Sequence, residues 1–110
     1  MNLKLNYEGF EENLMNTEKH RCLYDVDGIQ YLFRFDNNYG ASVIKHSGSY
    51  GYKEDLWELA VIKFYGDGIH DWNLNYETPI TDDVIGWQTD EGIRNLLQQI
   101  KELKNSTLLN

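Results

Sequence analysis

The sequence predicts an α+β domain, with an antiparallel sheet of four to five strands and a C-terminal helix packed on one face. Short apolar stretches separated by turn residues occupy residues 20–76, which is the pattern of strands joined by tight connections. One stretch with helical spacing follows, over residues 89–104. We expect the apolar stripe of this helix to pack on the sheet face that carries Tyr31, Phe33 and Phe35.

The first 19 residues carry conflicting signals. Leu3, Leu5 and Tyr7 alternate with polar residues and predict a short strand. The apolar residues between Phe10 and Met15 fit one or two turns of helix instead. We therefore expect residues 1–19 to be loosely attached to the domain.

A β-hairpin is predicted over residues 20–35. Residues 21–26 form one arm and residues 29–35 the other. Asp27-Gly28 between them favours a type I′ turn, because both central positions of that turn need a positive φ. One face of the second arm carries large apolar side chains and is expected to join the core. These side chains are Ile29, Tyr31, Phe33 and Phe35.

Three more strands are expected downstream. Residues 41–46 and 56–65 are apolar and flank a loop over 47–54 that is rich in glycine, serine and tyrosine. The 56–65 stretch is apolar on both faces apart from Glu58 and Lys63, which predicts a central strand covered by a helix on one face and by loops or a partner on the other. A fifth strand is expected over residues 72–76.

The last part of the chain predicts a short turn and then the helix. Thr81 is a candidate N-cap and Gly86 a terminator for a turn over residues 81–86. Thr89 is the predicted N-cap of the final helix, with acidic residues in the first turn, where they meet the positive end of the helix dipole. The apolar stripe of this helix consists of Ile93, Leu96, Leu97, Ile100 and Leu103.

Length and composition indicate one domain over residues 1–110, with residues 106–110 loosely attached. The chain is 41% hydrophobic and 14% aromatic, which argues against a disordered protein. No apolar run reaches the ~20 residues that a membrane span needs, and no signal peptide is visible. Cys22 is the only cysteine, so an internal disulfide is excluded and a cytoplasmic location is expected.

The formal net charge of −8 makes free nucleic acid a poor direct partner, because phosphate binding needs a basic surface. The charge is concentrated between Lys63 and Arg94, where the chain has no lysine or arginine. Seven acidic residues lie in this acidic segment: Asp67, Asp71, Glu77, Asp82, Asp83, Asp90 and Glu91. They form either a solvated rim or a surface that meets a basic protein partner.

The sequence does not predict an enzyme, a metal site or a bound cofactor. His20, His46 and His70 are scattered, and His20 with Cys22 offers only two ligands on one strand face. A Cys22 nucleophile with a distant histidine base remains an alternative without a local signature. The acidic pairs at 82–83 and 90–91 could bind a hard cation, but helix capping is favoured because alternating oxygen ligands are missing.

The loop over residues 47–54 is a candidate contact surface. Its glycines lack the spacing of a phosphate-binding or dinucleotide-binding loop. Tyr39, Tyr50 and Tyr52 lie in or near this loop, and tyrosine is enriched at protein interfaces. The alternative is that these rings cap the edge of the sheet.

Four ordered blocks of the sequence carry a resemblance to a protein family. They are residues 39–46 (YGASVIKH), 49–51 (SYG), 56–62 (LWELAVI) and 76–91 (YETPITDDVIGWQTDE). In these blocks the chain resembles small, uncharacterised proteins encoded by tailed phages and prophages. The resemblance covers roughly residues 29–103 and departs from the pattern at Gln88. It implies a phage or prophage origin and action in a bacterial cytoplasm, and it brings no catalytic residues.

Three hypotheses for function follow. The first is a phage accessory protein that binds another protein without catalysis; its sharper form inhibits a host defence nuclease, such as a CRISPR effector, through an acidic surface that mimics DNA. The second is a small ligand-binding protein or enzyme with a pocket under the 47–54 loop. The third is a structural or assembly homo-oligomer that associates through a strand edge or through a face carrying Trp57 and Tyr65.

Overall fold

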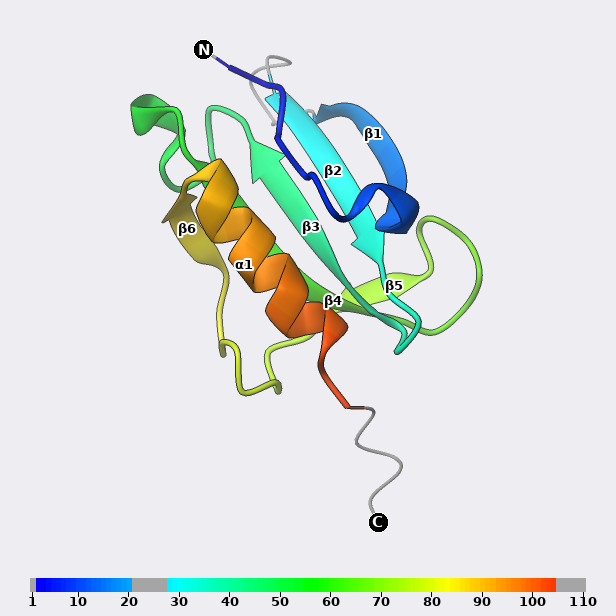
Figure 1. The fold of residues 1–110 in the computed structure, drawn as a ribbon. Helices are drawn as coiled ribbons and strands as arrows, with labels where there is room; N and C mark the ends of the chain where they lie inside the picture. The colour runs from blue at the N-terminus through cyan, green and yellow to red at the C-terminus, as the bar shows by residue number, and fades with distance from the viewer. Residues whose placement is uncertain (1, 21–27, 105–110) are drawn as a thin grey trace.

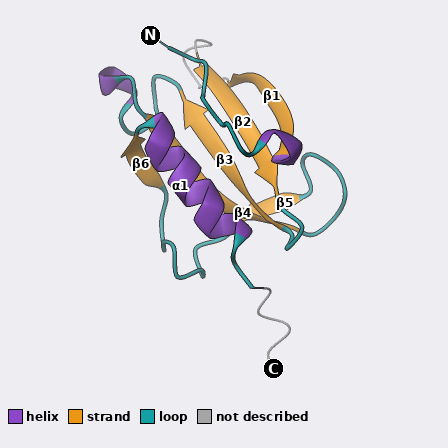
Figure 2. Ribbon diagram, in the orientation of Figure 1, coloured by secondary structure: helices purple, strands orange, loops and turns teal. Residues whose placement is uncertain are grey.

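A computed structural model describes residues 2–20 and 28–104 and confirms the predicted class, an antiparallel sheet with one α-helix packed on it (Figures 1 and 2). The strands run in the order β1-β2-β3-β4-β5, and β6 also pairs with β4. The elements are β1 (Leu14–His20), β2 (Gly28–Arg34), β3 (Tyr39–Lys45), β4 (Trp57–Phe64), β5 (Trp72–Leu74), β6 (Ile85–Gln88) and α1 (Asp90–Lys101), with short 3₁₀ turns at Glu11–Asn13 and Tyr52–Glu54.

The strand that pairs with β2 in the structure precedes the predicted first arm of the hairpin. β2 pairs with β1, and Lys19 lies opposite Ile29. The predicted arm over 21–26 and the turn at Asp27 lie outside the described residues. A bulge in β1 between Leu14 and Asn16 explains why this stretch looks helical in the sequence. The adjacent Leu14 and Met15 pack on clusters at opposite faces of the sheet, as successive residues of a strand do.

Residues 2–10 cover β2 as an extended segment without strand pairing, so the strand predicted over residues 3–7 is wrong. Leu5 and Phe10 are buried in the main core. The Tyr7 ring contacts Phe33 edge-on, with ring centroids 5.8 Å apart. Figure 1 shows this segment crossing the same side of the sheet as α1. The segment is therefore packed on the sheet and shields the aromatic residues of β2.

Helix α1 begins as the sequence predicts. The Thr89 Oγ1 atom accepts a hydrogen bond from the Gly92 backbone N–H at 3.0 Å, which satisfies one of the free amides of the first turn. Ile93, Leu97 and Ile100 are fully buried and lie in the same core cluster as Tyr31, Phe33 and Phe35. The helix contacts β3 and β4 directly, and the aromatic residues of β2 are covered by residues 2–10 instead.

The region before α1 contains a strand that the sequence did not predict. The expected capped turn ends early: Thr81 Oγ1 accepts a hydrogen bond from Asp83 N, and β6 begins at Ile85. Gly86 lies inside this strand rather than terminating a turn. β6 pairs with the start of β4, whereas β5 pairs with its end. Long-range pairing with β4 therefore decides the conformation here.

The face of the sheet opposite α1 has a smaller apolar cluster. Leu32, Ile62 and Phe64 are buried there, with Trp72 packed beside them. No helical residue of the described chain belongs to this cluster. Trp57 lies on the α1 side and is fully buried, so a joint Trp57 and Tyr65 contact face is wrong. None of the helices in residues 2–20 and 28–104 is long and apolar enough to cross a membrane.

The buried side chain of Lys45 connects the extended segment of residues 2–10 to the sheet through hydrogen bonds. Lys45, only 1% exposed, donates hydrogen bonds from Nζ to the Asn2 backbone carbonyl at 2.7 Å and to Asp55 Oδ1 at 2.8 Å. Nζ also bonds the Asp55 backbone carbonyl and lies 4.1 Å from the centroid of the Trp57 ring. The ammonium group thus has the partners that a buried charge requires.

We predict that Lys45→Met destabilises the fold by about 1–3 kcal/mol, because buried acceptors lose their donor while the stem still packs on Trp57. Urea denaturation measures this change. The amide of Leu5, which bonds the Tyr31 hydroxyl, should also exchange with solvent faster. Lys53→Met, at an exposed position, is the matched control and should change stability little. Equal effects of the two substitutions would contradict the assigned role of Lys45.

A pH dependence follows from Asp55. The hydrogen bond from Lys45 lowers the pKa of this carboxyl below 3.8, assisted by the Asn2 N–H and opposed by desolvation. A lowered pKa in the folded state contributes stability above the unfolded value, and this stability is lost as the pH falls through the folded value. The free energy of unfolding should therefore fall more steeply below pH ~4 in the wild type than in Asp55→Asn. Parallel curves from urea denaturation at several pH values would disprove the linkage.

Candidate functional site

Two large aromatic side chains stand exposed at one end of the sheet. Tyr50, in the loop before β4, and Trp87, in β6, are each 56% exposed. Their rings are stacked, with centroids 5.3 Å apart and planes inclined by 30°. Aromatic side chains of this size are usually mostly buried, so an exposed stacked pair indicates a contact surface.

A β-bulge aims Trp87 outward. Trp57 pairs with Gln88 and Leu59 pairs with Ile85, so two residues of β6 lie opposite Glu58 alone. Bulges of this kind redirect a side chain and are frequent near functional sites. The extra residue places Trp87 beside the loop over 47–54, where its backbone N–H faces the Tyr50 carbonyl at 3.4 Å.

Two glycines permit this close approach. A Cβ atom on Gly86 would lie 2.4 Å from the Tyr50 Cβ. Gly51 has a φ of +92°, and a Cβ there would lie 2.9 Å from the Trp87 Cα. The pairing of the loop with β6 therefore requires glycine at both positions.

The backbone at this end of the sheet is strained. Trp87 has a φ of +54°, in the left-handed region that L-residues with a bulky side chain rarely adopt, whereas Asp55, with a φ of +61°, is of a type that tolerates this region better. Such a conformation costs about 1–2 kcal/mol per residue. Strain of this kind, held by the surrounding structure at an exposed tryptophan, points to function.

A carboxylate holds each partner of the stack. The Trp87 Nε1–H donates to Glu54 Oε1 at 3.1 Å, and the Tyr50 backbone N–H donates to Glu58 Oε1 at 3.0 Å. Tyr50, Trp87, Glu54 and Glu58 together are called the aromatic–acidic site. A cleft of about 210 Å³ lies beside it, lined by both rings and by Lys53. The site combines flat apolar surface with negative charge.

The acidic segment divides into three separate regions. Asp67 and Asp71 lie in the loop between β4 and β5, and Asp71 Oδ2 accepts a hydrogen bond from Gly68 N. Figure 1 shows this loop on the opposite side of the molecule from the loop between β5 and β6. The second loop contains Glu77, Asp82 and Asp83, and the start of α1 contains Asp90 and Glu91. The segment thus forms no single acidic face.

Basic residues from elsewhere in the chain approach each of these regions. Arg34 donates from Nη1 to the Gly66 carbonyl at 2.8 Å, beside the first loop. Lys63 and Lys104 line a cleft together with Glu77. Near the start of α1, Arg94 donates to the Asn6 carbonyl. Residues 64–93 contain no lysine or arginine, but folding places basic side chains from other parts of the chain beside them and so partly offsets their negative charge.

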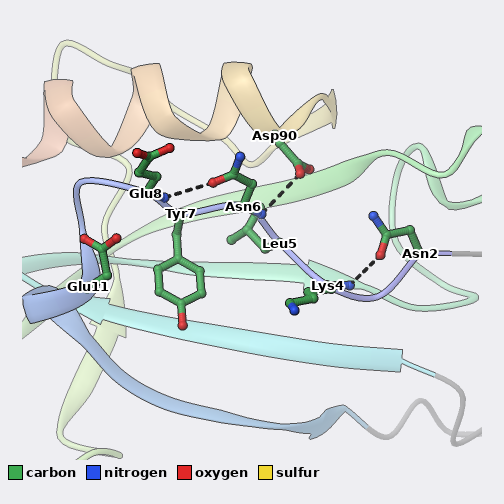
Figure 3. A pocket seen from close by; sticks show the side chains of 8 residues that line it. All are labelled: Asn2, Lys4, Leu5, Asn6, Tyr7, Glu8, Glu11 and Asp90. Carbon is green, nitrogen blue, oxygen red and sulfur yellow. Dashed lines mark hydrogen bonds between the residues drawn. The ribbon is translucent and has the colours of Figure 1, made fainter.

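Asp90 has a structural role in the fold. Its Oδ1 atom accepts a hydrogen bond from Trp57 Nε1 at 2.7 Å. Its Oδ2 atom accepts one from the Asn6 N–H at 3.1 Å, as Figure 3 shows. A groove of about 470 Å³ lies here, along the segment of residues 2–11. Figure 3 shows Glu8 and Asn6 above it and the Tyr7 ring pointing toward the sheet. Asp90 thus joins the helix, β4 and the extended segment.

The predicted tyrosines have different environments. Tyr39 is only 6% exposed and belongs to the core, with Lys63 Nζ above its ring, so it offers no contact surface. Tyr52 is half-buried in the 3₁₀ turn. Tyr50 alone of the three is mostly exposed. Sequence reasoning missed Trp87, for which the adjacent Gly86 was the available signal, because the expected turn hid β6.

The histidines and carboxylates do not assemble a metal site within the described residues. No group of three His, Cys, Asp or Glu side chains in this part of the chain could hold a metal ion. His46 Nδ1 accepts a hydrogen bond from the Gly48 N–H at 3.0 Å, and His70 is exposed in the loop between β4 and β5. His20 ends β1, and Cys22 lies outside the described residues.

We predict that Trp87→Gly changes the free energy of unfolding by less than about 1 kcal/mol. Loss of the ring stack costs about 0.5–1.5 kcal/mol, and relief of the left-handed strain returns a similar amount. Urea denaturation of this variant is compared with that of Trp57→Phe, which loses its buried hydrogen bond to Asp90 and should be less stable than the wild type. A loss above 3 kcal/mol for Trp87→Gly would make Trp87 a structural residue.

Comparisons with known proteins identify no family for this chain. No protein-family model, curated protein or solved structure matches the chain. The likeness to phage-encoded proteins therefore stays a prediction.

Proposed function

We propose that this protein acts without catalysis, by binding another protein whose contact surface is basic, and that the aromatic–acidic site makes the contact. The observation that carries the proposal is the stacked pair of Tyr50 and Trp87, each more than half exposed and each held by a carboxylate. Tryptophan and tyrosine dominate the binding energy of protein interfaces.

Preorganisation of the site supports this proposal. The Trp87 ring is fixed by its stack, by its hydrogen bond to Glu54 and by the bulge of β6. A partner therefore binds a side chain that has already lost most of its rotamer freedom. Ordering a flexible side chain at an interface costs about 0.5–1.5 kcal/mol, and this cost is largely removed here.

Charge supports a basic partner. The net charge of −8 attracts a positively charged protein at long range and accelerates association. The three regions of the acidic segment contribute to this field from different sides of the molecule. In this proposal they steer the partner, and the aromatic–acidic site provides the close contact.

The sharper form of the proposal names the class of partner. A nucleic-acid enzyme carries a basic groove, because it has to neutralise phosphates. A phage accessory protein in a bacterial cytoplasm would meet such enzymes as host defence nucleases, including CRISPR effectors. Occupying the groove in place of DNA would inhibit the nuclease. The resemblance to phage-encoded proteins and the negative charge support this form.

The test is quantitative capture of proteins from bacterial lysate. Wild-type protein and Tyr65→Ala, an equally bulky but unrelated exposed tyrosine at 69% exposure, should retain the same partner. Tyr50→Ala and Trp87→Ala should each reduce its retention by about 30-fold, the loss expected at an interface hot spot. Retention should also fall as the salt concentration of the wash rises.

The acidic segment has its own variant. Replacing Asp67, Asp71, Asp82 and Asp83 with Asn should slow association and reduce its salt dependence, without abolishing the complex. Capture that is unchanged by Tyr50→Ala and Trp87→Ala would refute a contact through the aromatic–acidic site. A complex indifferent to salt would refute a basic partner.

A further inference from the structure

We infer that the aromatic–acidic site receives an arginine side chain of the partner. This inference rests on the proposed function and narrows the chemistry of its contact to a guanidinium group. It is carried by three features of the site: the orientation of the rings, the unused carboxylate oxygens and the size of the adjacent cleft.

The rings offer a flat surface for a planar cation. Tyr50 and Trp87 stack on each other, with their planes inclined by only 30°, so one face of each ring is used within the pair. With 56% of each residue exposed, surface of the pair remains open to solvent. A guanidinium group stacks on such a surface through cation–π attraction, for which tryptophan is the best aromatic partner.

The carboxylates have acceptor capacity left. Glu54 uses Oε1 for the Trp87 indole, and Glu58 uses Oε1 for the Tyr50 backbone N–H. Within residues 2–20 and 28–104, the Oε2 atom of neither carboxylate accepts a hydrogen bond. Arginine carries five N–H donors in a rigid plane and can stack on a ring while it donates to a carboxylate. Lysine, a compact point charge, cannot do both with the same group.

The cleft fits one side chain better than a free ligand. Its volume of about 210 Å³ lies below the roughly 300–1,000 Å³ of pockets that bind small molecules. Lys53 also lines the cleft and is exposed. Its charge repels an incoming guanidinium, so it opposes binding, whereas Glu54 in the same 3₁₀ turn favours it. The two neighbours should therefore respond in opposite directions to neutralisation.

Three peptides of one glycine–serine sequence test the inference, with two arginines, two lysines or two citrullines at the same positions. Citrulline keeps the planar shape and hydrogen-bonding groups but lacks the charge. The readout is the indole N–H signals of the three tryptophans in ¹H–¹⁵N spectra. Trp57 and Trp72 are internal controls because they lie outside the aromatic–acidic site: Trp57 is buried in the main core, and Trp72 packs on the cluster at the opposite face of the sheet.

The arginine peptide should shift the Trp87 indole signal and leave the other two unchanged. It should bind at least about five-fold tighter than the lysine peptide, and the citrulline peptide should show no saturable shift. Glu58→Gln and Glu54→Gln should each weaken arginine binding about ten-fold, the effect of a lost charge-assisted hydrogen bond. Lys53→Gln should strengthen it about two-fold.

Equal affinity for the lysine and arginine peptides would overturn the arginine assignment, as would a shift at Trp72 in place of Trp87. Absence of any shift at Trp87 would overturn it too. None of these results would contradict the proposed function. That proposal is tested separately, by whether the Tyr50→Ala and Trp87→Ala variants fail to retain the captured protein.

Discussion

The buried ammonium group of Lys45 is the contact on which both the fold and the site depend. A charge that is 1% exposed is tolerable only if every donor finds an acceptor, and here the acceptors come from Asn2 and Asp55. Asn2 fixes the start of the extended segment over the core. Asp55 closes the loop over residues 47–54 and sits in a left-handed conformation that the ion pair helps to hold. One side chain thus positions both the cover of β2 and the base of the loop that presents Tyr50.

Asp90 and Trp57 extend the same network to β6, the strand that carries Trp87. The hydrogen bond between them ties the first turn of α1 to β4. Thr89 and Asp90 follow directly on β6, so the strand that carries Trp87 is anchored just after its last residue. Tyr50 and Trp87 therefore lie on two segments that hydrogen bonds hold in place. The backbone strain at Trp87 can persist because neither segment is free to relax.

Much of the fold could be predicted from local patterns. β3, β4 and α1 have strong periodicity and a clear cap at Thr89, and they lie within a few residues of the predicted ranges. β1 and β6 could not be found in this way, because both contain bulges that break the alternation of side chains. The extended segment over β2 was also missed, since side chains distant in sequence satisfy its backbone, such as Tyr31 for Leu5. These contacts exist only in the tertiary structure.

The difference between local sequence patterns and tertiary contacts also explains why the site differs from the one that the sequence suggested. Charge is visible in a sequence, and the acidic segment stood out for that reason, but folding distributes its residues around the molecule. An electrostatic field adds over such distances and needs no common face, whereas a binding contact needs groups within a few ångströms of one another. Tyr50 and Trp87 are 37 positions apart in the chain and meet only through the bulge opposite Glu58. In the proposed function, long-range attraction therefore belongs to the dispersed carboxylates, and close recognition to the pair that the fold assembles.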